Sequence, residues 1–191
     1  TSQYLPGSNL YSALPFNADL TWEKTTTLNA GLDFNFFKNN LISGAFDIYL
    51  NKTTDLLAQV PTAPGQYLRD SFITNVGETE GRGFELDLNI KPISNDISTL
   101  EFYSNIAYNH VKITNLGDVE RIIAGGGLPT GTNVNTQVHA LGYQPGAFWL
   151  FQQLYDSNGN VIPGAFVDRN DDGQITNDDR YYIKRTPNWT F

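Results

Sequence analysis

Hydrophobic and polar residues alternate along four segments of this chain. From about 25 to 36, leucine, alanine and phenylalanine occupy one set of positions, and threonine, asparagine and aspartate occupy the positions between them. The same alternation recurs at about 41–51, 83–91 and 99–110. A period of two predicts β-strands with one apolar and one polar face. Strands of about 9–11 residues are long enough to cross a bilayer when they are tilted.

The connections between these predicted strands alternate between short turns and long loops. Residues 38–40 and 92–98 form short turns that close two hairpins. The leading segment, about 1–24, and the connections at about 52–82 and 111–187 are long. Bacterial outer-membrane barrels have short periplasmic turns and long extracellular loops. The sequence therefore predicts an all-β chain that forms part of an antiparallel transmembrane β-barrel.

The polar faces of the strands are expected to line the lumen of that barrel, where water would solvate their ionisable groups. The lumen residues predicted in this way are Asp33, Asp47, Tyr49, Glu85, Asp87, Tyr103 and Asn105. A soluble, calcium-stabilised β-sandwich that binds carbohydrate is the alternative, because its strands also alternate. In a sandwich, Leu32, Phe34, Phe46 and Leu88 would lie inside a closed core.

Composition removes several classes of function. The chain of 191 residues has no Cys, so disulfides and thiol-based sites are excluded. Its net charge of -8 argues against nucleic acid as a partner. The two histidines, His110 and His139, have no Ser elbow nearby, so no catalytic site is predicted and the chain is expected not to be an enzyme. A glycosidase fragment stays open, because paired catalytic acids are recognised by their spacing in the fold.

The segment 166–180, FVDRNDDGQITNDDR, carries a metal-binding pattern. From position 168 to 179 it follows the spacing of an EF-hand-type calcium loop, closed by Asp in place of Glu. The predicted Ca²⁺ ligands are Asp168, Asn170, Asp172, Gln174 (through its main-chain carbonyl) and Asp179. A solvated acidic turn is the alternative, because Asp, Asn and Gly are common in turns. Since no flanking helix pair is evident, the predicted role is a structural clip within a long loop.

Several stretches of the chain resemble the SusC/RagA-type TonB-dependent outer-membrane transporters. They occur in the expected order over almost the whole length. The stretches are LPFNADLTWEKTTTLNAGLDF (14–34), NKTTDLL (51–57), NVGETEGRGFEL (75–86), GYQPGAFWLFQQ (142–153), the calcium-type loop (166–179) and RTPNWTF (185–191). The resemblance implies a fragment of the C-terminal barrel, in the outer membrane of a Gram-negative cell, without the plug and the TonB box. The absence of any Met, also at position 1, agrees with the expectation of a piece of a longer protein.

The resemblance also implies a function. Members of that family import glycans or peptides, so the expected cargo is an oligosaccharide or a peptide. The expected partners are a SusD-type surface lipoprotein, TonB through the missing N-terminal part, and outer-membrane lipid. Aromatic residues of the long loops could stack on cargo or serve as packing anchors. These loop aromatics are Tyr67, Tyr143, Trp149 and Tyr155.

Overall fold

The computed structural model describes residues 17–61, 71–124 and 135–191. Tyr67 and most of the leading segment lie outside the described residues. Apart from two single-turn 3-10 helices, all regular elements of the described part are β-strands, so the all-β, antiparallel fold class is confirmed. Within those ranges, no helix has the length and apolar character needed to cross a membrane.

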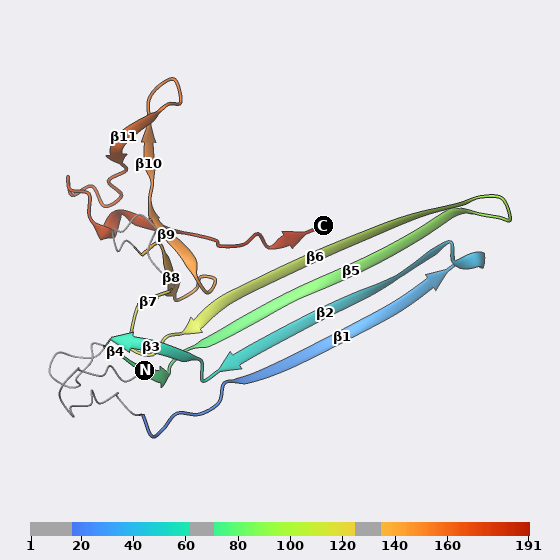
Figure 1. Cartoon of the computed structure of the whole chain (residues 1–191), viewed down its shortest axis with the longest axis horizontal. Coiled ribbons are helices and arrows are strands. Elements are labelled where there is room, and N and C mark those ends of the chain that lie inside the picture. Colours follow the sequence, from blue (N-terminus) through green and yellow to red (C-terminus); the bar gives the residue numbers. More distant parts are fainter. Residues whose placement is uncertain (1–16, 62–70, 125–134) are drawn as a thin grey trace, which may run out of the picture.

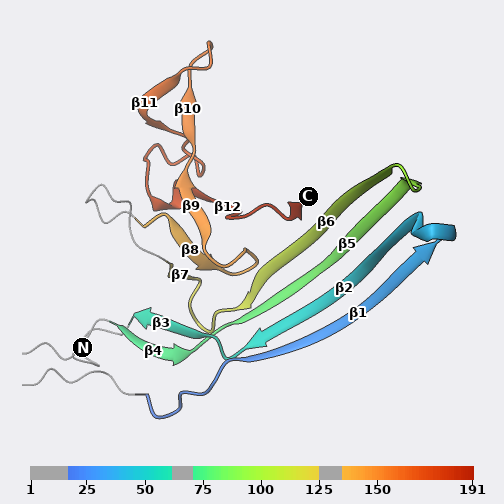
Figure 2. The same ribbon diagram turned by 45° about the vertical axis from the view of Figure 1, so that its right-hand side comes forward.

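Four long strands form a curved antiparallel sheet, with a short fifth strand at one edge (Figures 1 and 2). The order is β1 (Lys24–Phe36), β2 (Ile42–Thr54), β5 (Glu78–Ser94), β6 (Thr99–Asn115) and β13 (Trp189–Thr190). Among the described residues, the edge strands β1 and β13 do not pair with each other, so this main sheet is open. An open edge cannot exist in lipid, because its backbone groups would lack hydrogen-bond partners. An open, curved sheet agrees with the expected arc of a barrel wall.

The two ends of the main sheet differ. At one end, the 3-10 helix η1 (Lys38–Asn40) links β1 to β2, and a tight turn with a hydrogen bond from Asn95 N–H to the Ser98 carbonyl links β5 to β6. We call this the turn end. At the opposite end, which we call the loop end, the chain leaves the sheet into the long connections (Figure 1).

The strands run further toward the loop end than the apolar alternation predicts. β5 begins at Glu78, where about 83 was expected, and β6 ends at Asn115, where about 110 was expected. The additional residues pair in register, for example Glu80 with Lys52 and Lys112. Backbone hydrogen bonds continue the ladder there, and they need no apolar side chains.

In its described parts, the long connection 111–187 contains strands that the apolar alternation does not predict. It folds into a four-stranded sheet, which we call the loop sheet, and a hairpin (Figure 2). The strands of the loop sheet, in spatial order, are β12 (Arg180–Ile183), β9 (Ala147–Phe151), β8 (Gln137–Ala140) and β7 (Arg121–Ile123). The hairpin pairs β10 (Gln153–Tyr155) with β11 (Val161–Phe166). In the connection 52–82, β3 (Leu57–Pro61) likewise pairs with β4 (Ser71–Asn75).

The buried hydrophobic residues lie at the loop end. Val60, Ile113, Leu116 and Ile122 form one cluster where β3, the end of β6 and β7 meet. Val138, Ala140 and Ala147 are buried in the loop sheet. Within the described ranges, β1 and β2 contribute no buried hydrophobic side chain. The loop end thus has a small core of its own, whereas Ile113 at the end of β6 is the only buried residue among the described residues of the four long strands, which argues against the soluble sandwich.

Candidate functional site

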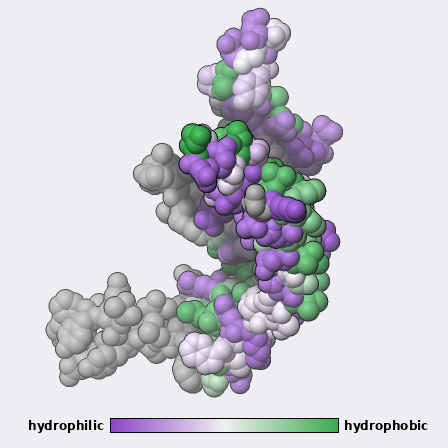
Figure 3. Space-filling model, turned by 90° about the vertical axis from the view of Figure 1, so that its right-hand side faces the viewer, coloured by the Kyte–Doolittle hydropathy of each residue, from purple (hydrophilic) through white to green (hydrophobic). Residues whose placement is uncertain are grey.

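One face of the main sheet is apolar and exposed. Leu32, Phe46, Leu86 and Ile106 form a row across β1, β2, β5 and β6. The exposed fraction is 64% for Leu32, 39% for Phe46 and 37% for Ile106. Figure 3, a view from the turn end, shows hydrophobic side chains gathered along one side of the curved sheet. A continuous apolar band on a strand wall is the surface that a transmembrane barrel presents to lipid.

An aromatic cluster lies toward the loop end of this apolar face. The ring centroids of Phe84 and Tyr108 are 5.9 Å apart. The ring of Trp189 is edge-on to both, at 5.7 Å from Phe84 and 5.0 Å from Tyr108. Tyr and Trp are enriched where a membrane meets water, because their rings are apolar and their N–H or O–H groups are polar. The cluster therefore marks one boundary of the apolar band.

The opposite face of the main sheet is polar. Asp47 stands directly across from Glu85, and the Asn105 Nδ2 donates to Asp87 Oδ1 over 2.5 Å. At the turn end, Lys91 forms an ion pair with Glu101. Tyr49 and the other residues predicted to line the lumen alternate with the apolar set, so they share this face. Charged groups gathered on the concave side of a barrel wall require a wet interior.

Large side chains cover glycines on the neighbouring strands. A Cβ on Gly44 would lie 2.7 Å from Phe34 Cζ, and closer still to the Asp87 carbonyl oxygen. A Cβ on Gly83 would lie 2.5 Å from Cζ of Tyr49. Both glycines have neighbours on the adjacent strand that occupy the space of a side chain. They let the strands pack closely on both faces of the wall.

Gly44→Val is expected to lower the free energy of unfolding by about 1–3 kcal/mol, because the added side chain overlaps the Phe34 ring and the β5 backbone. Guanidinium unfolding of the detergent-solubilised whole protein measures the change. Ala30→Val is the control, since Ala30 is exposed on the same face and the variant is expected within about 0.5 kcal/mol of wild type. Equal effects of the two variants would contradict the packing role of Gly44.

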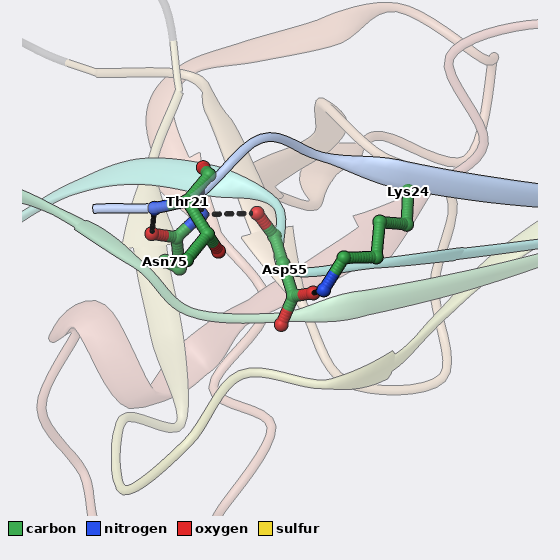
Figure 4. Close-up of polar contacts among 4 residues, drawn as sticks. All are labelled: Thr21, Lys24, Asp55 and Asn75. Atoms are coloured by element: carbon green, nitrogen blue, oxygen red, sulfur yellow. Dashed lines mark hydrogen bonds and ion pairs between the residues drawn. The ribbon is translucent and has the colours of Figure 1, made fainter. Parts of the chain in front are cut away.

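A polar junction ties three segments together at the loop end (Figure 4). The Asn75 side chain accepts a hydrogen bond from the Thr21 N–H at 2.8 Å and donates to the Thr21 and Asp55 carbonyls at 2.8 and 2.6 Å. The Asp55 carboxylate pairs with Lys24 at 3.0 Å. Asp55 has a φ of 59°, which Asp tolerates better than most residues. The sequence analysis missed this junction, because Asn75 is 54 residues from Thr21.

Two of the loop aromatics have packing roles. Trp149 lies 4.6 Å from the guanidinium carbons of both Arg121 and Arg180. The Tyr143 ring packs on Tyr182 with centroids 4.2 Å apart. Tyr155, at the end of β10, is 59% exposed. Packing therefore accounts for Trp149 and Tyr143, and Tyr155 is free to contact other molecules.

The calcium-type loop is folded by its own side chains. Asp168 Oδ2 accepts from the Gly173 N–H at 2.7 Å, and Asp172 Oδ1 accepts from the Gln174 N–H at 2.7 Å. The Asn170 Nδ2 donates to Asp172 Oδ2 at 3.0 Å. The φ of Gly173 is +79°, a left-handed value that glycine adopts without strain. The first, third and fifth predicted ligands thus lie together around one turn.

Asp179, the closing ligand of the predicted set, is completely buried. It accepts from the Thr176 and Arg169 N–H groups at 2.7 Å each, and these bonds hold its pKa below the ordinary value. Across the described ranges, no three His, Cys, Asp or Glu side chains gather as a metal cluster. Backbone N–H groups donate to the carboxylates of Asp168, Asp172 and Asp179 in this loop.

Comparisons with known proteins agree with this two-faced wall. The family model for the TonB dependent receptor-like β-barrel matches residues 2–191. The TonB-dependent receptor SusC of Bacteroides thetaiotaomicron is 41% identical, over 96% of this chain and 19% of that protein. The TonB-dependent receptor P26 of Formosa agariphila is 32% identical, over 86% of this chain and 18% of that protein. The chain thus spans about a fifth of the length of these relatives.

Solved structures show the same fold. The RagAB peptide importer in its open-open state superposes with a TM-score of 0.70 and 25% identity, over 99% of this chain and 20% of that one. The RagAB peptide transporter gives a TM-score of 0.69 at 24% identity, over 98% of this chain and 21% of that one. The open sheet is accordingly a fragment of a larger barrel. The chain belongs to the TonB-dependent receptor-like β-barrel family, whose members lie in the outer membrane of Gram-negative bacteria.

Proposed function

We propose that this chain forms barrel wall and extracellular loops of a TonB-dependent outer-membrane importer. The observation that carries the proposal is the main sheet, which exposes one apolar face and one charged face without a covering layer. Such a sheet fits a wall between lipid and a wet passage. The folded loop end, with its own core, fits the extracellular side, and the tight turns fit the periplasmic side.

The proposed cargo is an oligosaccharide or a peptide, and the proposed role is transport without catalysis. The structure named as a peptide importer favours a peptide as cargo. The higher identity to SusC favours the same class of cargo as that of SusC. A SusD-type surface lipoprotein is proposed as the extracellular partner, and TonB as the energising partner through parts of the protein outside this chain. The exposed Tyr155 lies on the hairpin that extends from the loop sheet, where such contacts would occur.

Uptake by cells tests the importer. A strain that lacks the whole protein is expected to lose uptake of a labelled oligosaccharide mixture or of a labelled peptide mixture. Returning the gene is expected to restore uptake, and a strain without TonB is expected to show the same loss. Unchanged uptake of both mixtures in the deletion strain would contradict the importer, whereas loss of one mixture alone identifies the cargo class.

We also propose that the loop 168–179 holds Ca²⁺ as a structural clip. Asp168, Asn170, Asp172 and Asp179 would supply side-chain oxygens, and Gln174 would supply its main-chain carbonyl. All these donors are oxygen atoms, which suits a hard cation. Each carboxylate oxygen that accepts one N–H keeps a further lone pair for a cation. The bound ion would join the turn at Asp168 to the closing residue Asp179.

Limited proteolysis of the whole protein tests the calcium clip. Millimolar Ca²⁺ is expected to slow cleavage within 166–180 relative to chelator, and Asp168→Ala is expected to abolish the difference. Asp156→Ala is the matched control, because Asp156 makes similar turn bonds in the neighbouring hairpin but lies outside the motif. The control is expected to keep the wild-type response. Equal cleavage of the wild type with Ca²⁺ and with chelator would overturn the calcium clip.

A further inference from the structure

A shallow depression of about 390 Å³ lies on the outward face of the main sheet, where the apolar rows end toward the loops. Leu28 and Leu50 form its apolar side. Arg82 stands across from Leu50, and His110 stands across from Arg82, so the four residues form one row. Since Arg82 is two positions from Phe84 on β5, it projects from the same face as the apolar band.

The next row toward the loops adds two more cations. Lys52 and Lys112 both pair in register with Glu80. Each lysine also has an acidic neighbour within ion-pair distance, Glu78 at 2.9 Å for Lys52 and Glu80 at 3.6 Å for Lys112. Arg82 differs from both, because it is exposed and forms no ion pair with any residue of the described ranges. The depression, which Glu80 also lines, therefore contains one guanidinium without an acidic partner among the described residues.

The aromatic cluster fixes the level of this guanidinium in the membrane. Phe84 and Tyr108 form the row directly below Arg82 and His110, and Trp189 packs on both rings. If those rings lie at the boundary between lipid and water, Arg82 lies at the level of the lipid headgroups. An unpaired cation at that level attracts anionic headgroups. A guanidinium matches the geometry of a phosphate with two parallel hydrogen bonds, which an ammonium cannot form.

We propose that Arg82 binds the phosphate of an outer-leaflet lipid, with Lys52 and Lys112 beside it and the acyl chains running from Leu28 and Leu50 down over Ala30 and Ile48. This inference rests on the proposed orientation, in which the loop end faces the cell exterior. The phosphorylated lipid of that leaflet is lipopolysaccharide, whose lipid A part joins phosphate to acyl chains. Because the depression combines apolar and cationic sides, it fits such a molecule better than it fits free phosphate.

Native mass spectrometry of the whole protein in detergent tests the site, with phosphorylated lipid A as the probe. Arg82→Gln is expected to weaken binding about fivefold, and Arg82→Lys is expected to give an intermediate value. Lys38→Gln is the matched control at the turn end, and its binding is expected to equal that of the wild type. Lipid A without phosphate is expected to bind the wild type and Arg82→Gln equally weakly.

Two results would overturn the lipid site. The first is equal binding of phosphorylated lipid A to wild type and Arg82→Gln. The second is displacement of lipid A by an equal concentration of inorganic phosphate, which would make this a site for free phosphate.

The orientation is read separately in cells. Asn158→Cys in the β10–β11 hairpin is expected to react with a membrane-impermeant maleimide, whereas Asp96→Cys in the β5–β6 turn is expected not to react. This chain contains no cysteine. Once any cysteine elsewhere in the whole protein has been replaced, each variant carries a single site for the label. If Asn158→Cys is labelled and Arg82→Gln keeps its lipid binding, the lipid site alone fails. If Asp96→Cys is labelled instead, the proposed orientation fails with it.

Discussion

Replacing Leu32 with arginine is expected to destabilise the folded protein by about 2–4 kcal/mol. Leu32 is 64% exposed and lies in the middle row of the apolar band, with Phe46, Leu86 and Ile106 across the sheet. In water an exposed leucine could become arginine at little cost. In a bilayer the guanidinium at the midplane loses its hydration, so the cost is large. Unfolding of the whole protein in lipid vesicles by guanidinium measures it.

The neighbouring residue supplies the control. Asp33 is next to Leu32 on β1 but faces the polar side, in the row of Asp87 and Asn105. Asp33→Arg is expected to change the free energy of unfolding by less than about 1 kcal/mol, because the lumen solvates either charge. Leu28→Arg, at the loop end of the band, is expected to cost about 0–1 kcal/mol, because the cost falls toward the interface. Similar costs for Leu32→Arg and Asp33→Arg would contradict the assignment of the two faces.

The faces of the main sheet could be predicted from the sequence because lipid enforces them. Each outward position between Leu28 and Phe36 must be apolar, so a period of two survives along the whole membrane-crossing part. Beyond it, the same strands continue through Glu80, Gly81 and Arg82, which carry no apolar signal. There the ladder with β2 and β6 extends the strand, and pairing between distant segments is not visible in one segment alone. The predicted strands were therefore too short mainly at the loop end, and at the turn end β5 also runs on to Ser94.

The loop end shows why the rest could not be predicted. Strands β7 to β10 have three to five residues each, too few for alternation to be distinguished from chance. Within this set, β7 packs through Ile122 against Val60, a residue that is far away in the sequence. The calcium-type loop is different, because its side chains bond to backbone groups two to five residues away. Local spacing could therefore predict the shape of that turn, while occupation by Ca²⁺ stays a prediction.

Asn75→Ala is expected to lower the free energy needed to open the junction at the loop end by roughly 2–3 kcal/mol. The reason is that it removes three hydrogen bonds worth about 0.5–1.5 kcal/mol each. The loss of stability is expected to be confined to the junction, because the long strands of the wall pair independently of Asn75. Hydrogen exchange of the whole protein measures it residue by residue. The amide of Thr21, whose acceptor is the Asn75 side chain, is expected to lose protection, while amides in the centre of β2 keep theirs.

Asn29→Ala makes the same chemical change elsewhere on the wall and is the matched control. Asn29 is exposed on the polar face of β1, and its side chain makes no hydrogen bond with another described residue. This variant is expected to leave the protection of Thr21 unchanged. If Asn75→Ala also leaves it unchanged, the junction does not hold the leading segment. If protection from hydrogen exchange instead falls throughout β1 and β2, the junction is part of the global folding unit, because the wall then depends on the contacts at the loop end.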